Sequence, residues 1–461
     1  MLFLLALGAP SAAQDRASPL DRFVPTGPFA GGVPQGTPTS APLALTVGDA
    51  IRRSLEYNLG VLLSQQEVDH ARGSRAVALG QLLPNISASV SEVRQVRNLE
   101  AFGFPLRGFP PTVGPFNVFD ARLFLSQSIF DLHALKDARA EAHSVQAARY
   151  SYQDAREAVI LATAAAYLQA LAASARAESV RAQFDTAQAL HAQAQDLKQG
   201  GLVAGIDVVR ADVRVSTGRQ RTTAAETDLQ KAQLQLARMI GLPLGQSFTL
   251  SDQIPYVDMP DISLEQALEN AYRNRFDYQA AQERVRAAEA SRDAALGERL
   301  PSVRVNADYG FIGLTAGSAR STFSVAGAVS IPIFEGGRAQ GRLAEADADL
   351  RNRRSEAEDL RAAIYYEVRS AFLDLRSSEQ ELQAATRTRD LANQELTQAR
   401  DRFAAGVANN IEVVQAQEAV ALGSEQAITA SYLFNLSKAR LAESLGTAEQ
   451  TVEKYLGGTS R

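Results

Sequence analysis

The chain has 461 residues and a formal net charge of −5, with 46% hydrophobic residues and neither cysteine nor tryptophan. The lack of cysteine excludes disulfides, thiolate metal sites and cysteine nucleophiles in this sequence. The mild acidity and the lack of any basic run argue against nucleic acid as a partner, because nucleic-acid binding normally requires a basic face.

The first 44 residues are predicted to lie outside any folded domain. Residues 1–13 are apolar and end in small residues around Ser11 and Ala13. This pattern is typical of a signal peptide, and the alternative is a disordered apolar N-terminus of a cytosolic protein. Residues 14–44 are rich in Pro, Gly, Ser and Thr, which favours an extended linker. No later stretch has about 18 uncharged apolar residues, so we expect no transmembrane helix.

The chain from residue 45 onward contains an internal repeat, in which residues 45–90 align without a gap with residues 262–307. Later segments match as well, namely 128–131 with 332–335 and 206–209 with 411–414. A repeat on this scale predicts two related units, residues 45–250 and 251–461. We expect each unit to run helix, strand hairpin, very long helix, break and helix.

A helix opens each of these units. Thr46 and Ser263 are plausible N-caps, and apolar residues from Val61 onward follow one helical face towards Pro84. Because proline interrupts a helix, Pro84 and Pro301 are predicted to end these helices and to mark the change into strand.

Two strands per unit are predicted where apolar and polar residues alternate. The four segments are residues 86–96, 118–129, 303–311 and 323–331. They fall within residues 85–129 and 302–333. Each has about ten residues, the length that crosses a bilayer at a tilt. A sheet packed on a soluble core alternates in the same way, so the pattern alone leaves both interpretations open.

Helices of unusual length follow the strands. Residues 131–199 and 338–404 contain no proline and almost no glycine, and at 1.5 Å per residue each helix would be about 100 Å long. A narrow seam of small residues favours a coiled coil. Glycine-bearing breaks at 200–205 and 406–410 precede return helices, so each long helix is predicted to form an antiparallel hairpin.

Four strands in one chain cannot close a barrel. In lipid each unpaired backbone group at an open sheet edge costs several kcal/mol, so only closed barrels are stable there. If the strands lie in a membrane, further copies must therefore supply the missing strands. Eight, twelve or sixteen strands would each close.

Short motifs recur in the same order in both halves. They are Leu-Thr-Val-x-x-Ala-Ile at 45–51, Leu-Pro at 83–84 and 300–301, Ile-Phe-Asp/Glu at 129–131 and 333–335, and the breaks at 201–204 and 406–408. In this order the chain resembles the TolC-type outer-membrane efflux family over about residues 45–456. One departure is that Leu59 and Phe276 stand where the family often has proline.

The resemblance implies a mainly α fold with a membrane β-barrel part. The expected assembly is a homotrimer with a twelve-stranded barrel in outer-membrane lipid and an α-helical barrel in the periplasm of a Gram-negative bacterium. It would act as the passive exit duct of a tripartite efflux pump or type I secretion system. Its expected partners are a periplasmic adaptor (membrane fusion) protein and an inner-membrane transporter.

The alternative is a periplasmic coiled-coil adaptor or scaffold. Adaptors, however, have one helical hairpin and lipoyl-like β domains, not two helix–ribbon units. The sequence has no P-loop, dinucleotide-binding, serine-hydrolase or zinc-protease motif. The histidines, which lack paired ligand spacing, are His70, His133, His143 and His191. We therefore expect no enzyme activity, no cofactor and no metal site.

The two breaks contain the candidate docking residues, which are small or apolar where exposed turns are usually polar. They are Gly201, Leu202, Val203, Ala204 and Gly205 in the first break, and Gly406, Val407 and Ala408 in the second. The resemblance implies that a helical hairpin of the adaptor docks here. Packing of these tips against one another within the trimer is the alternative.

Two acidic residues, Asp207 and Glu412, follow the breaks. A negative charge at a helix N-terminus complements the macrodipole by about 0.3–1 kcal/mol, which would explain both residues without a channel role. The resemblance instead places Asp207, Glu412 and Gln415 at the periplasmic constriction of the duct. Because Gln415 is neutral, we expect one acidic layer at that turn.

Overall fold

The computed structural model describes most of the chain. The described residues are 27–99, 101, 103, 110–201, 203–252, 262–405, 407 and 410–456. The predicted signal peptide and residues 14–26 of the predicted linker lie outside them. The chain divides into two compact units, which are not the two sequence repeats. The first unit comprises residues 1–63, 153–275 and 363–461, and the second comprises 64–152 and 276–362.

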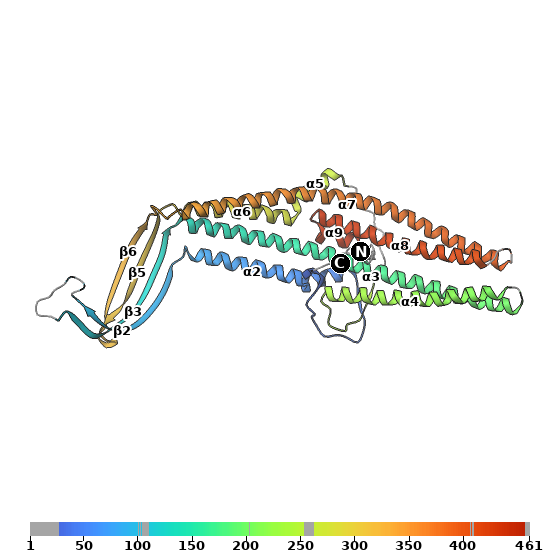
Figure 1. The fold of residues 1–461 in the computed structure, drawn as a ribbon, viewed down its shortest axis with the longest axis horizontal. Coiled ribbons are helices and arrows are strands. Elements are labelled where there is room, and N and C mark those ends of the chain that lie inside the picture. Colours follow the sequence, from blue (N-terminus) through green and yellow to red (C-terminus); the bar gives the residue numbers. More distant parts are fainter. Residues whose placement is uncertain are drawn as a thin grey trace, which may run out of the picture. The chain divides into compact units, whose positions relative to one another are not determined.

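The second unit contains a four-stranded antiparallel sheet (Figure 1). In spatial order its strands are β2 (Asn85–Asn98), β3 (Thr112–Phe130), β5 (Ser302–Gly313) and β6 (Arg320–Ser330). All four predicted strands are confirmed, and β3, with 19 residues, is longer than expected. The pairing of β3 with β5 joins the two halves of the sequence in one sheet.

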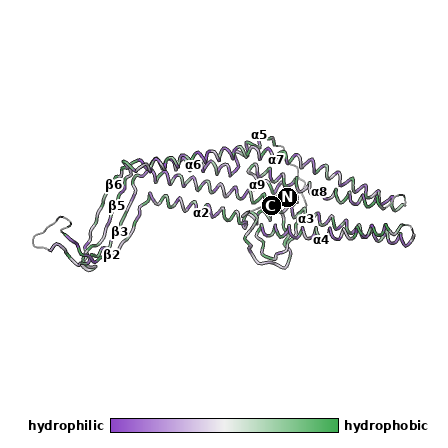
Figure 2. The backbone as a smooth tube through the Cα atoms, viewed as in Figure 1, coloured by the Kyte–Doolittle hydropathy of each residue, from purple (hydrophilic) through white to green (hydrophobic). Residues whose placement is uncertain are grey.

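The register of this sheet separates most side chains into an apolar and a polar face, because alternate residues of a strand point to opposite sides. The apolar face includes Ile86, Val90, Leu123, Leu125, Val305, Ala307, Tyr309, Phe323 and Val325. The polar face includes Ser87, Ser89, Arg122, Ser126, Arg304, Asn306, Asp308 and Ser324, with Phe124 as an exception. Hydrophobic and hydrophilic residues are accordingly intermixed along the strands (Figure 2).

The second unit is completed by α2 (Leu59–Gly80), α6 (Phe276–Gly297) and the first parts of α3 (Leu132–Gln199) and α7 (Arg338–Ala404). The two long helices have 68 and 67 residues, and their bounds confirm the predicted ones. Ion pairs connect these helices. Lys136 Nζ lies 2.7 Å from Asp293 Oδ2, and Arg292 Nε lies 2.6 Å from Asp347 Oδ1.

The opening helix of each half was predicted as one helix and is two. α1 (Val47–Tyr57) is followed by α2, and α5 (Leu264–Asn274) by α6, with extended backbone at Asn58 and Arg275. Asn58 is fully buried, its Nδ2 donates to Phe29 O at 3.0 Å, and its Oδ1 accepts from Gly60 N at 2.9 Å. The bond from Gly60 N gives an amide in the first turn of α2 a side-chain acceptor, and the bond to Phe29 O ties the break to a distant segment.

The predicted helix ends at Pro84 and Pro301 are four residues too late. α2 and α6 end at Gly80 and Gly297, and the strands begin directly after the prolines. A proline disfavours the α conformation in the residue before it, which is Leu83 or Leu300 here, and this favours an earlier helix end.

The first unit holds the main core, which is built on the middle of α3. Its fully buried residues include Ile160, Ala164, Tyr167, Leu168, Leu236, Met239, Tyr432 and Leu436. A short parallel pair not predicted from the sequence, β1 (Leu43–Leu45) and β4 (Phe248–Leu250), packs against this core. The Tyr167 hydroxyl lies 2.9 Å from Leu45 O and 2.8 Å from Asp252 Oδ2, and burial raises the pKa of Tyr167.

The expectation that no stretch of about 18 residues is apolar enough to cross a membrane is wrong. Among the described helices, α3 contains an 18-residue window that is long and apolar enough to cross a membrane, and 67% of that window is buried inside the protein. Core helices share this property, since their apolar residues pack against other helices instead of lipid.

Two return helices and a short terminal helix complete the first unit. They are α4 (Gly205–Met239), α8 (Asn410–Ser444) and α9 (Ala448–Tyr455). The first two confirm the predicted hairpins, whereas α9 was not predicted. Its N-terminus is held by the Glu157 carboxylate, which accepts from Ala448 N at 2.5 Å and from Glu449 N at 3.3 Å.

Candidate functional site

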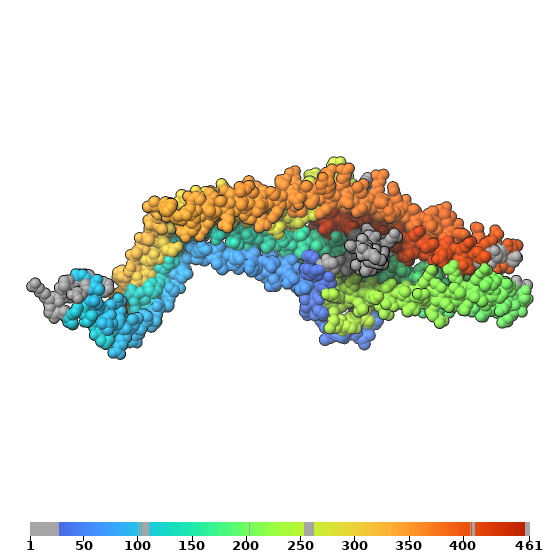
Figure 3. All heavy atoms as spheres, in the orientation of Figure 1, coloured from blue at the N-terminus to red at the C-terminus, as the bar shows by residue number. Residues whose placement is uncertain are grey.

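The ends of the α3–α4 and α7–α8 hairpins lie side by side within the first unit (Figures 1 and 3). They are joined by a small apolar cluster in which Val413 and Ala416 of α8 pack against Ala399 of α7 and Leu190 of α3. The two predicted breaks are therefore brought together at one end of this unit.

A glycine allows the chain to turn at the first break. Gly201 has a φ of +71°, a conformation that favours glycine, and its amide donates to Lys198 O at 3.0 Å. A Cβ added there would meet no atom within 4 Å, so the constraint is backbone conformation and not space. Ala204 is the N-cap of α4, and its side chain makes no capping hydrogen bond. Leu202 lies outside the described residues.

The second break is described only in part. Gly406 and Ala408 lie outside the described residues. Val407 donates from its amide to Arg402 O at 3.0 Å, and its side chain is 69% exposed. The tip of this hairpin thus presents an apolar side chain to its surroundings.

An exposed apolar stripe on α4, which sequence analysis missed, extends the first tip. Ile206, Val209 and Val213 are each more than half exposed. Their spacing of three and four residues places them on one face of the helix. That spacing is visible in the sequence, but only the packing of α4 reveals that this face is left uncovered by the described residues.

Both candidate acids have a basic neighbour. Asp207 is in the first turn of α4, 3.4 Å from Arg210 Nη1, and Glu412 is in the first turn of α8, 3.5 Å from Arg402 Nε. Arg402 belongs to α7, so the second pair bridges the hairpin, and no local pattern predicted it. Both partners are about half exposed, which limits the pair to about 1 kcal/mol or less. Gln415 is exposed one turn later.

The polar face of the sheet has its own charge cluster. Arg122 of β3 forms ion pairs with Asp120, at 3.2 Å, and with Asp308 of β5. It also lies 3.3 Å from the Thr322 hydroxyl of β6. Charged residues therefore gather on the face opposite the apolar one.

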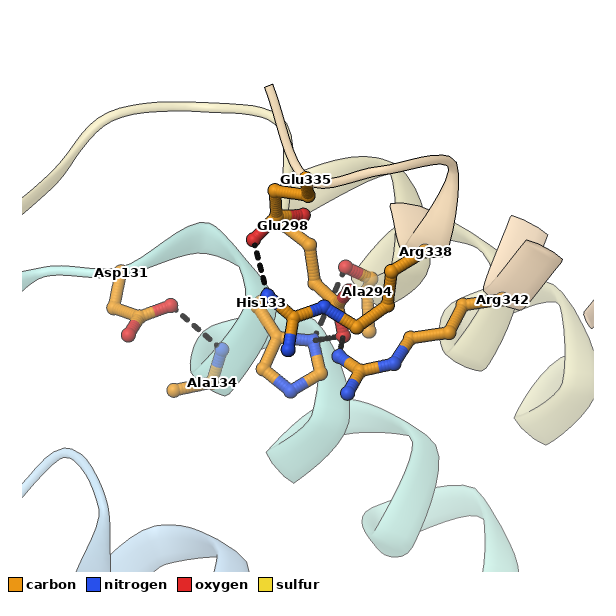
Figure 4. A network of polar contacts seen from close by, with 8 residues as sticks. All are labelled: Asp131, His133, Ala134, Ala294, Glu298, Glu335, Arg338 and Arg342. Carbon is orange, nitrogen blue, oxygen red and sulfur yellow. Dashed lines mark hydrogen bonds and ion pairs between the residues drawn. The ribbon is translucent and has the colours of Figure 1, made fainter. Parts of the chain in front are cut away.

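A polar network lies where the strands meet the long helices (Figure 4). Asp131 Oδ1 accepts from Ala134 N at 3.0 Å and so caps α3. His133 Nδ1 lies 3.2 Å from Ala294 O, and Glu298, its neighbour at 3.6 Å, pairs with Arg342 at 2.5 Å. In the part of the chain that is described, no group of three His, Cys, Asp or Glu side chains is arranged to hold a metal ion.

Comparison with known proteins identifies the family. The chain matches the family model for "Outer membrane efflux protein" over residues 50–242 and 267–447. It is 25% identical to the pyoverdine export outer membrane protein OpmQ of Pseudomonas putida, over 88% of this chain and 84% of that protein. It is 24% identical to the outer membrane protein TolC of Escherichia coli, over 72% of this chain and 70% of that protein.

The fold is shared with solved structures of the same kind. The CmeC outer membrane channel of Campylobacter jejuni matches with a TM-score of 0.76 at 17% identity, covering 89% of this chain and 88% of that one. The family and these neighbours are channels and outer-membrane proteins, not enzymes. The chain belongs to the outer membrane efflux protein family, and it is a TolC-like channel protein of the Gram-negative outer membrane that reaches into the periplasm.

Proposed function

We propose that three copies of this chain form the passive exit duct of a tripartite efflux pump or type I secretion system. The single observation that supports the proposal most is the sheet of the second unit. It has one apolar and one polar face, and within the described residues the outer edges of β2 and β6 have no partner strand. A sheet of this kind suits a membrane barrel whose polar face lines a lumen.

Closure requires other copies of the chain. The open edges would each leave a row of backbone groups unpaired in lipid, at several kcal/mol per group. If β6 of one copy pairs with β2 of the next, three copies supply twelve strands and no edge remains. The trimer itself is taken from the family resemblance, since eight or sixteen strands would also close.

Matching element lengths support the proposed duplication. α1 and α5 have 11 residues each, α2 and α6 have 22 each, and α4 and α8 have 35 each. We propose that residues 45–250 and 251–461 are two copies of one sequence repeat, preceded by the signal peptide at 1–13 and the linker at 14–44.

The hairpin ends are the proposed docking site for a periplasmic adaptor, which would connect the duct to an inner-membrane transporter. The tips offer an apolar surface to a helical partner. This surface consists of exposed Val407, the turn at Gly201 and the stripe of Ile206, Val209 and Val213. The proposed docking residues also include Leu202, Val203, Ala204, Gly205, Gly406 and Ala408. Asp207, Glu412 and Gln415 are proposed to line the periplasmic constriction.

The test of the assembly is fractionation of cells expressing the full chain, followed by electrophoresis with and without heating. We expect the protein in the outer-membrane fraction, as a trimer that heating converts to a monomer. Release by osmotic shock, or a stable monomer in mild detergent, would contradict the proposal.

A further inference from the structure

A cavity of about 360 Å³ lies within the first unit, where α3, α4, α7 and α8 do not pack fully against one another. Volumes in this range are typical of sites for small organic molecules. The cavity is distinct from the hairpin tips, the constriction acids and the sheet. None of the roles proposed above uses it.

The charged residues of the cavity lining are three arginines and one acid. The Glu418 carboxylate of α8 accepts from Arg214 Nη1 at 2.7 Å and lies 3.5 Å from Arg221 Nη2. The hydrogen bond from Arg214 holds the pKa of Glu418 below its usual value, so this acid is ionised at neutral pH. The Glu418 carboxylate thus pairs with two guanidinium groups. Together with Arg400, the lining carries three positive charges and one negative charge, a net charge of +2.

Arg400 of α7 lines the cavity and forms no ion pair among the described residues. Its Nε atom is buried and has no hydrogen-bond partner among the described residues. Its guanidinium charge therefore has no protein counter-charge there, and an anion in the cavity would supply one.

The rest of the lining suits an apolar body. Val180 and Phe184 of α3, Leu396 of α7 and Val420 of α8 line the same cavity as the arginines. Phe184 packs directly against the backbone of α4, since a Cβ added at Gly218 would lie 3.0 Å from its ring. An occupant with one charged end and one apolar end would match both parts of the wall.

We propose that this cavity binds a small organic anion, a carboxylate attached to an apolar or aromatic body. The carboxylate accepts hydrogen bonds from Arg400 and Arg221, and the body lies against Phe184 and Leu396. Inorganic anions lack the apolar part and bind more weakly. Neutral analogues lack the acceptor charge that Arg400 requires.

The test is isothermal titration calorimetry on the purified full-length protein in detergent, with 1-naphthoate as the probe. We expect 1-naphthoate to bind about tenfold tighter than neutral 1-naphthamide and than inorganic phosphate. Arg400→Gln should weaken naphthoate binding by about the same factor. Arg387→Gln, at an exposed arginine of α7 outside the lining, is the matched control and should leave binding unchanged.

A second variant separates the cavity from general charge. Ala421→Phe adds a ring to the lining and leaves every charge in place, so it should abolish binding of the probe. Lack of naphthoate binding to the native protein, equal affinity for the amide, or unchanged binding by Arg400→Gln would each overturn the proposal. The titration involves neither adaptor nor membrane, so its failure would leave the proposed duct function unaffected.

Discussion

At the scale of single residues, a few glycines allow close approach at the ends of the return helices. Gly241 and Gly446 follow α4 and α8 with φ values of +62° and +67°. A Cβ at Gly446 would lie 2.9 Å from Arg275 N, and one at Gly241 would lie 2.8 Å from Tyr57 Cβ. Each glycine therefore lets the end of a return helix pack closely against a helix break, at residues 57–58 for α4 and at Arg275 for α8.

Glu412 is the residue on which the proposed constriction depends. By three-fold symmetry it would form a ring of carboxylates, and such rings attract cations. Glu412→Gln should reduce the cation selectivity of the channel in planar bilayers and its block by multivalent cations. Arg402→Gln, which removes the basic neighbour 3.5 Å away, should have the opposite effect. Unchanged selectivity and block in Glu412→Gln would leave only the helix-terminus role.

Glu418 should contribute to the pH dependence of stability. Its pKa is lowered in the folded protein, chiefly by the hydrogen bond from Arg214. Its stabilising effect is therefore present above the ordinary value of 4.5 and is lost as the pH falls through the lower folded value. Between about pH 5 and pH 3, the Tm of the native protein should fall more than that of Glu418→Gln.

The matched control for this experiment is Glu395→Gln, at an exposed acid of α7. Its Tm should follow that of the native protein across the same pH range. Parallel pH profiles for the native protein and Glu418→Gln would show that the Arg214–Glu418 pair has no part in acid sensitivity.

At the scale of elements, helix ends and exposed stripes decide what each helix can contact. α3 ends where Gly201 permits a turn, and α4 then begins with three exposed apolar residues on one face. In contrast, the middle of α3 is buried on nearly every side by neighbouring helices. The same chain thus provides both a core helix and the proposed docking surface.

The α4 stripe should determine adaptor binding. Val209→Asp places a charge where an apolar contact is proposed, and burying it unpaired costs several kcal/mol. We expect efflux of a fluorescent substrate to fall about tenfold or more, with trimer assembly unchanged. Leu234→Asp, an exposed position near the other end of α4, is the control and should retain efflux.

The turn can be tested in the same assay. Gly201→Val should impair docking. Gly245→Val is the control, because Gly245 also has a positive φ, of +83°, and equally open surroundings. Valine therefore strains the backbone there to the same extent, but away from the tips. Equal efflux from Val209→Asp, Gly201→Val and the native protein would exclude docking at this tip.

At the scale of the whole molecule, the two sheet faces should meet different solvents. Because the chain has no cysteine, single cysteines can be labelled without background. Cysteines at Val305 and Val329, on the apolar face, should react with probes dissolved in lipid, and those at Arg304 and Ser330 with aqueous probes. The reverse pattern would contradict a membrane barrel with a polar lumen.

The sequence by itself determined the features that arise from local backbone preferences. Alternation along residues 303–311 and 323–331, the prolines before β2 and β5, and the proline-free runs of α3 and α7 act over a few residues. Strand positions and long-helix bounds were therefore predictable, as was the family. The resemblance also indicated where to look for tips and acids.

Only the tertiary structure decided features that depend on residues far apart in the chain. The helix break at Asn58 is held by Phe29 O and Met239 O, and Arg275 pairs with Glu367 at 2.5 Å. Arg214 and Arg221 of α4 meet Glu418 of α8 only because the two hairpins pack together. No local pattern encodes such contacts, because their free energy comes from burial and pairing between distant segments.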